Sequence, residues 1–125
     1  MPKRRSWLWI GLVLGGAVVA GAVVTTRGSS AAVSYSGSIQ PIFDRSCVSC
    51  HPTSYPYLDL RAGRSYQSLV GVPAYTDPAF DRVLQGRPDL SFLLTHPVDP
   101  SNATLLSGAD RALIRAWIAE GAPNN

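Results

Sequence analysis

Hydrophobic positions divide the chain into an apolar amino-terminal run and a longer region with helical spacing. Trp7 to Val24 is an uncharged run of 18 residues that follows the basic residues Lys3 to Arg5. This combination is typical of an export segment. A cleaved signal usually has an apolar core of about 7 to 15 residues, whereas about 18 can nearly span a bilayer. We therefore expect residues 1–24 to be a retained signal anchor, with cleavage near Ala20 to Ala22 as the alternative.

The basic flank also sets the orientation that we expect for the chain. Positive residues stay on the cytoplasmic side, so residues after the apolar run would lie on the periplasmic or extracytoplasmic side of the cell membrane, with a single pass. Residues 25–35 are rich in Ser, Thr, Gly and Ala, lack apolar periodicity and are predicted to be a flexible linker. Residues 36–125 then have the length of one small domain.

An amphipathic helix is predicted at the start of this domain. The apolar residues on one side of it are Ile39, Ile42 and Phe43. Ser36 or Ser38 can cap its amino-terminal end, because a serine side chain accepts a hydrogen bond from a free backbone N–H. The spacing predicts a helix that runs directly into Cys47.

The clearest helix lies near the end of the chain. Ser107 and Asp110 have the spacing of a capping box, and Gly121 followed by Pro123 marks the end of the helix. The apolar stripe consists of Leu113, Ile114, Trp117 and Ile118. Such a stripe needs a partner, so we expect this last helix to pack on the first helix of the domain.

The middle of the domain has weaker patterns. Prolines and hydroxyl residues at 52–56 predict a loop, and residues 57–60 form a short apolar stretch that could lie over a hydrophobic group. Short helices are predicted at Arg64 to Val70, Asp77 to Leu84 and Asp89 to Leu94. The domain is therefore predicted to be all-α.

The charge of the chain is unevenly distributed. The formal net charge is +3, but four of the eleven basic residues precede residue 33, which leaves seven arginines against eight acidic residues in the domain. A domain close to −1 has no basic surface of the size that nucleic-acid binding requires. The sequence therefore excludes nucleic acid as the expected partner.

The segment Cys47-Val48-Ser49-Cys50-His51 carries the candidate chemistry. Two thiols three positions apart can each add to one vinyl group of a haem, and the histidine that follows can bind the iron. We expect Cys47 and Cys50 to be the thioether anchors of one covalent haem c, and His51 to be the proximal iron ligand. The alternatives are half of a zinc site, which needs two further ligands, and a redox CxxC motif, which usually lies in a βαβ pattern that is not visible here.

The resemblance extends beyond this motif. Ser36 to His51, with an IQPIF helix leading into CxxCH, resembles the opening of cytochrome c domains in planctomycete-type and related bacterial proteins. Leu58 to Arg61, Pro88 to Leu94 and Ala112 to Ala122 are similar to later blocks of that family. The resemblance implies a small all-α cytochrome c-like fold around one haem. It also implies an electron carrier, not an enzyme, with redox proteins or a membrane redox complex as partners.

One departure from that family concerns the second iron ligand. Many members have a Met-Pro-Pro loop before the last helix, and its methionine is the second axial ligand. This chain has no methionine after Met1, and His96-Pro97 takes that place. The domain also lacks lysine and a third cysteine, which leaves His51 and His96 as its strong-field ligands. His96 is therefore the candidate distal ligand, and bis-histidine ligation predicts a lower reduction potential than that of a Met-ligated relative.

Other functions follow if His96 does not bind iron. It would then be an exposed loop histidine, and a five-coordinate haem could bind gases, act as a sensor or carry out peroxidase-like chemistry. A partner could also supply the sixth ligand, or the chain could be the haem subunit of a larger membrane redox complex. No catalytic residue is expected. Arg61, Arg64 and Arg82 are interpreted as solvated, although any of them could pair with a haem propionate.

Overall fold

The computed structural model describes residues 21, 31–95 and 105–125. The expected membrane anchor at 1–24, apart from Gly21, most of the expected linker and His96 lie outside these residues. Within the described part of the chain, no helix is long and apolar enough to cross a membrane. The described domain is small and rich in helix, and the part described contains no named strand, which agrees with the all-α prediction.

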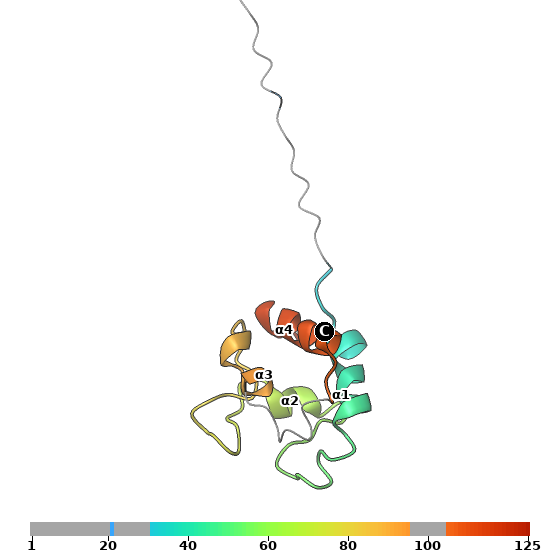
Figure 1. The fold of residues 1–125 in the computed structure, drawn as a ribbon, viewed down its shortest axis with the longest axis vertical. Helices are drawn as coiled ribbons and strands as arrows, with labels where there is room; N and C mark the ends of the chain where they lie inside the picture. The colour runs from blue at the N-terminus through green and yellow to red at the C-terminus, as the bar shows by residue number, and fades with distance from the viewer. Residues whose placement is uncertain (1–20, 22–30, 96–104) are drawn as a thin grey trace, which may run out of the picture.

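Six helical segments make up the described domain. They are η1 (Tyr35–Ile39, a π-helix), α1 (Gln40–Ser46), α2 (Ser65–Leu69), η2 (Pro88–Leu90, a 3-10 helix), α3 (Phe92–Thr95) and α4 (Gly108–Ala119). Figure 1 shows α4 along one side of the domain, with the carboxyl-terminal residues beside the start of the first helical segment.

The first helix begins earlier than the sequence predicts. Ser34 is its cap and accepts a hydrogen bond from the N–H of Gly37 at 3.0 Å, so the predicted cap at Ser36 or Ser38 is wrong. The N–H groups of Tyr35 and Ser36 donate to the side chain and backbone oxygens of Asn125, at 2.7 and 2.9 Å. Residue 125 therefore binds the first N–H groups of a helical segment that begins two to four residues earlier than predicted.

The cap of α4 is confirmed. Ser107 Oγ accepts the N–H of Asp110 at 3.0 Å, whereas the Asp110 carboxylate binds Arg45 of α1 at 2.9 Å. The apolar stripe is narrower than predicted, because Leu113 lies at its edge and is 40% exposed. The ion pair adds a polar link between α1 and α4.

The hydrophobic core lies between the first and last helices. Its buried residues are Tyr35, Ile39, Ile42, Phe43, Leu60, Leu69, Val83, Ile114, Trp117, Ile118 and Ala122. Most of them come from η1, α1 and α4, which confirms that these helices pack on each other. Burial of a large apolar side chain stabilises a fold by about 1.5 to 3 kcal/mol, so this contact is the main source of cohesion.

The middle of the domain follows the prediction in part. The helix expected at Arg64 to Val70 is confirmed as α2, within a residue at each end. The helix expected at Asp77 to Leu84 is wrong, because this segment pairs with residues 70–74 through isolated bridges between Val70 and Val83 and between Pro73 and Asp81. Backbone hydrogen bonds between these two segments satisfy N–H and C=O groups that a helix would have paired within itself.

The helix expected at Asp89 to Leu94 is divided at Ser91. This residue is fully buried and lies in extended conformation between η2 and α3. Its hydroxyl accepts the N–H of Leu84 at 2.9 Å and donates to the carbonyl of Arg87 at 2.9 Å. A serine hydroxyl competes in this way with the backbone bonds of a continuous helix.

A buried polar chain connects three helical segments. The Tyr35 hydroxyl donates to Ser65 Oγ at 2.6 Å, and Ser65 donates to Gln40 Oε1. The Gln40 amide donates to the Leu60 carbonyl at 3.0 Å. Burial raises the pKa of the Tyr35 hydroxyl from 10.0 to about 12, because the tyrosinate would lose its hydration.

This pKa predicts that the domain loses stability in alkali. The folded state holds the Tyr35 proton more tightly than the unfolded state, so the stabilisation is complete below pH 10 and declines as the pH rises towards 12. From pH 8 to pH 11 we expect Tyr35 to lower the unfolding free energy by about 1.4 kcal/mol. Urea titrations at pH 8 and pH 11 should show that the unfolding free energy of Tyr35→Phe falls by less than that of the wild type, by this amount. Tyr75→Phe is the control, because Tyr75 is 67% exposed; equal losses in both variants would contradict the assignment.

Candidate functional site

The Cys47 to His51 segment continues the direction of α1 as a series of tight turns. The N–H of Cys47 donates to the carbonyl of Phe43 at 2.8 Å, and the N–H groups of Cys50 and His51 donate to the carbonyl of Cys47 at 3.1 and 3.0 Å. Ser54 then donates to the carbonyl of Cys50 at 2.9 Å. Residues three positions apart in such turns lie on one face. The local backbone therefore supports the geometry that the CxxCH spacing predicts for two thioether bonds.

The two thiols have different surroundings. Both cysteines are free, Cys47 is half-buried against the hydrophobic core, and Cys50 is exposed. Burial raises the pKa of the Cys47 thiol to about 11, with a smaller contribution from the neighbouring Cys50. Redox CxxC motifs instead lower the pKa of a cysteine to favour the thiolate. The protonated state of Cys47 at neutral pH therefore disfavours the redox alternative.

The His51 imidazole is half-buried and neutral at pH 7. Burial lowers its pKa below 6.5, and the positive charge of Arg82 lowers it further. Backbone groups of Tyr55 and Leu58 oppose this shift, but Nδ1 is buried and has no hydrogen-bond partner among the described residues. Neutral imidazole is the form that binds metals.

Aromatic rings surround the imidazole. The ring centres of Tyr55 and Tyr57 lie 5.2 and 6.3 Å from that of His51. Tyr57 also stacks on Tyr75, with centres 4.3 Å apart and planes 9° from parallel. Only Tyr57 belongs to the apolar stretch recognised in the sequence; Leu60 of that stretch is buried in the core. No local sequence pattern indicated Tyr55 or Tyr75, because only the fold of the loops brings their rings next to Tyr57.

Arg82 also belongs to this neighbourhood. Its Nη1 donates to the carbonyl of Ser68 at 2.7 Å, and its Nη2 donates to the carbonyl of Tyr57 at 3.0 Å. Arg61 and Arg64 are exposed, as expected, and Arg61 binds Asp59 at 2.6 Å. Arg82 is half-buried, so its interpretation as a solvated residue holds only in part. Its pairing with residues 70–74 holds it in place, and no local sequence pattern indicated that pairing.

The described residues offer no site for an isolated metal ion. Within 31–95 and 105–125, no three His, Cys, Asp or Glu residues form a group that could hold one. The zinc alternative therefore finds no further ligands in this part of the chain. A haem needs only the two thiols and one or two axial ligands, and Cys47, Cys50 and His51 are brought together. His96 lies outside the described residues.

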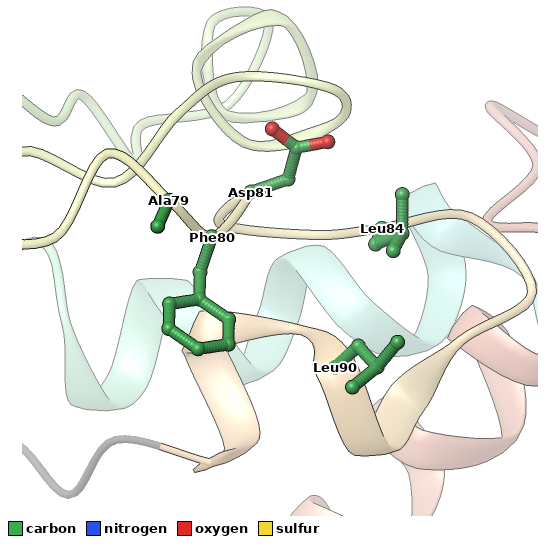
Figure 2. Close-up of a pocket in the computed structure, with 5 residues that line it drawn as sticks. All are labelled: Ala79, Phe80, Asp81, Leu84 and Leu90. Atoms are coloured by element: carbon green, nitrogen blue, oxygen red, sulfur yellow. The ribbon is translucent and has the colours of Figure 1, made fainter.

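A shallow pocket lies on a different part of the domain. It is lined by Ala79, Phe80, Asp81, Leu84 and Leu90 and has a volume of about 220 Å³. Figure 2 shows the Phe80 ring and Leu90 near η2, whereas the Asp81 carboxylate points away from them. Small-molecule sites usually have about 300 to 1,000 Å³. No residue of the Cys47 to His51 segment lines this pocket, so we do not regard it as the functional site.

Comparison with known proteins gives no relative for this chain: no family model, no curated protein and no solved structure matches it. The function is therefore argued from the residues of the chain.

Proposed function

We propose that the chain is a membrane-anchored c-type cytochrome that carries one covalent haem and transfers single electrons. The observation that carries this proposal is the CxxCH segment at the end of α1, with two free thiols in tight turns and a neutral, half-buried imidazole beside them. The resemblance of Ser36 to His51 to bacterial cytochrome c domains adds support.

The chain's residues have separate roles in this proposal. Cys47 and Cys50 hold the haem, since each S–H adds across a vinyl C=C bond with no leaving group. His51 would present a neutral imidazole to the iron, and the rings of Tyr55 and Tyr57 pack beside that imidazole. When bound, the haem supplies a one-electron iron couple. The packing of α1 on α4 holds the attachment segment in place while the electron moves.

His96 completes the proposal as the second axial ligand. Two imidazole ligands, from His51 and His96, would leave the iron coordinatively closed, so its ligands would rearrange little when its oxidation state changes. The amino-terminal segment would hold the domain at the extracytoplasmic face of the cell membrane. A redox protein or a membrane redox complex there is the proposed partner.

The decisive experiment is to produce the full chain in a bacterium that attaches haem c, and to analyse the detergent-extracted protein. We expect the haem to remain with the polypeptide on a denaturing gel, and the pyridine haemochrome spectrum to indicate one haem c per chain. A chain that carries no covalent haem in a host that matures a reference cytochrome would contradict the proposal.

A five-coordinate haem for gas binding, sensing or peroxidase-like chemistry is the second candidate. The absence of methionine after Met1 favours it, because the family's usual second ligand is missing. Carbon monoxide separates the two functions. The reduced electron carrier should keep its low-spin spectrum under carbon monoxide, whereas rapid binding of the gas would favour an open iron site.

A further inference from the structure

Arg82 differs from the other arginines of the described domain. Those with exposed side chains are Arg45, Arg61, Arg64, Arg87, Arg111 and Arg115. Arg82 is half-buried, and none of the ion pairs found among the described residues includes it. A charge that is partly withdrawn from water is stabilised by a partner of opposite sign. Arg82, which has no such partner among the described ion pairs, is therefore the arginine of this domain best suited to bind an anion.

The backbone and side chain of Arg82 are both held in place. Its N–H donates to the carbonyl of Val72 at 2.8 Å, and its carbonyl accepts the N–H of Leu93 at 3.0 Å. The guanidinium donates to Ser68 and Tyr57, as described above. A guanidinium has five N–H donors, so three remain after these two bonds. Burial lowers the pKa of Arg82, but arginine stays charged in proteins.

The position of Arg82 connects it with the proposed haem site. Tyr57 accepts a bond from the guanidinium through its carbonyl, and the ring of the same residue lies 6.3 Å from the His51 ring. Tyr57 therefore borders both Arg82 and His51. Haem carries two propionate carboxylates, and a planar guanidinium matches the geometry of a carboxylate.

We infer that Arg82 binds a propionate of the haem held by Cys47, Cys50 and His51. This inference rests on the proposed function and adds a residue to it. The bonds to Ser68 and Tyr57 fix the guanidinium, so the propionate receives a preformed donor. The same positive charge disfavours the oxidised iron, so Arg82 raises the reduction potential.

The test compares Arg82→Gln with Arg64→Gln in the full haem-loaded chain. Both changes remove one positive charge, but Arg64 is exposed and forms no ion pair among the described side chains. For Arg82→Gln we expect the redox equilibrium with a fixed mediator to shift about tenfold towards the oxidised state, or about 59 mV for one electron. The shift for Arg64→Gln should stay within about twofold. Resonance Raman spectra should show a change in the propionate bending mode only in Arg82→Gln.

Haem content is measured first, so that the two proposals can fail separately. A wild-type chain without covalent haem overturns both. If haem is present, an unchanged propionate mode in Arg82→Gln overturns the role of Arg82, even if the potential shifts through charge alone. Arg82→Lys covers the case in which the glutamine variant does not fold. Arg82→Lys keeps the positive charge but loses the planar guanidinium. It should therefore alter the propionate bending mode and leave the reduction potential close to that of the wild type. A propionate mode identical to that of the wild type in Arg82→Lys overturns the inference.

Discussion

The Cys47→Ser, Cys50→Ser double variant is expected to retain no covalent haem. Serine hydroxyls do not form thioether bonds to vinyl groups, whereas both wild-type thiols are free and lie in the same series of turns. The loss should be complete on a denaturing gel stained for haem. Each single variant should keep one thioether, which the pyridine haemochrome spectrum detects as a shift from the position typical of two bonds.

Ser49→Ala is the matched control for this result. Ser49 is exposed between the two cysteines, and its hydroxyl donates only a long, exposed hydrogen bond of 3.9 Å to the Cys50 sulfur, so its replacement keeps both thiols and the backbone bonds of the turns. We expect normal haem attachment in this variant. Covalent haem in the double-serine variant would mean that the attachment site lies elsewhere. Loss of haem in Ser49→Ala would mean that the middle of the segment has a role that this interpretation does not include.

His96→Ala is expected to convert the iron from low spin to high spin. Without a second imidazole the iron becomes five-coordinate or binds water, and the reduced protein gains the ability to bind carbon monoxide. Absorption and electron paramagnetic resonance spectra measure the spin state. Because the domain contains no methionine, lysine or third cysteine, it offers no other strong-field side chain to replace His96.

His96→Met is the informative companion variant. A thioether ligand should restore the low-spin state and raise the reduction potential above that of the wild type, since Met/His ligation favours reduced iron. An unchanged spin state in His96→Ala would show that His96 is not the ligand. The second candidate function, an open iron that binds small molecules, would then be preferred.

Two observations bear on the competing interpretations of the cysteine pair. The Cys47 thiol has a raised pKa, whereas a redox-active pair needs an accessible thiolate. The described residues also provide no further ligand group for zinc. Haem attachment needs neither an accessible thiolate nor further metal ligands of this kind, because it uses only the two thiols and the neighbouring imidazole. The predicted results for the cysteine and His96 variants separate attachment from ligation.

The candidate site was predictable where its residues are neighbours in sequence. Cys47, Cys50 and His51 lie within five positions, so any compact local conformation brings them together. Tyr75 and Arg82 are more than twenty residues from His51. Both contact Tyr57, which lies beside His51, and the pairing of residues 70–74 with residues 80–83 that positions them is not specified by any local pattern.

The sequence by itself determined the helix caps and apolar faces that depend on short spacing. Ser107 caps α4 as predicted, and the first and last helices bury the residues that their periodicity selects, except Leu113. Only the tertiary structure decided that Asn125 binds the start of the first helix at Tyr35, that Ser91 divides a predicted helix, and that Arg82 is half-buried. Capping and amphipathicity act over about one helical turn, whereas these three outcomes depend on partners elsewhere in the chain or on the burial of a polar group.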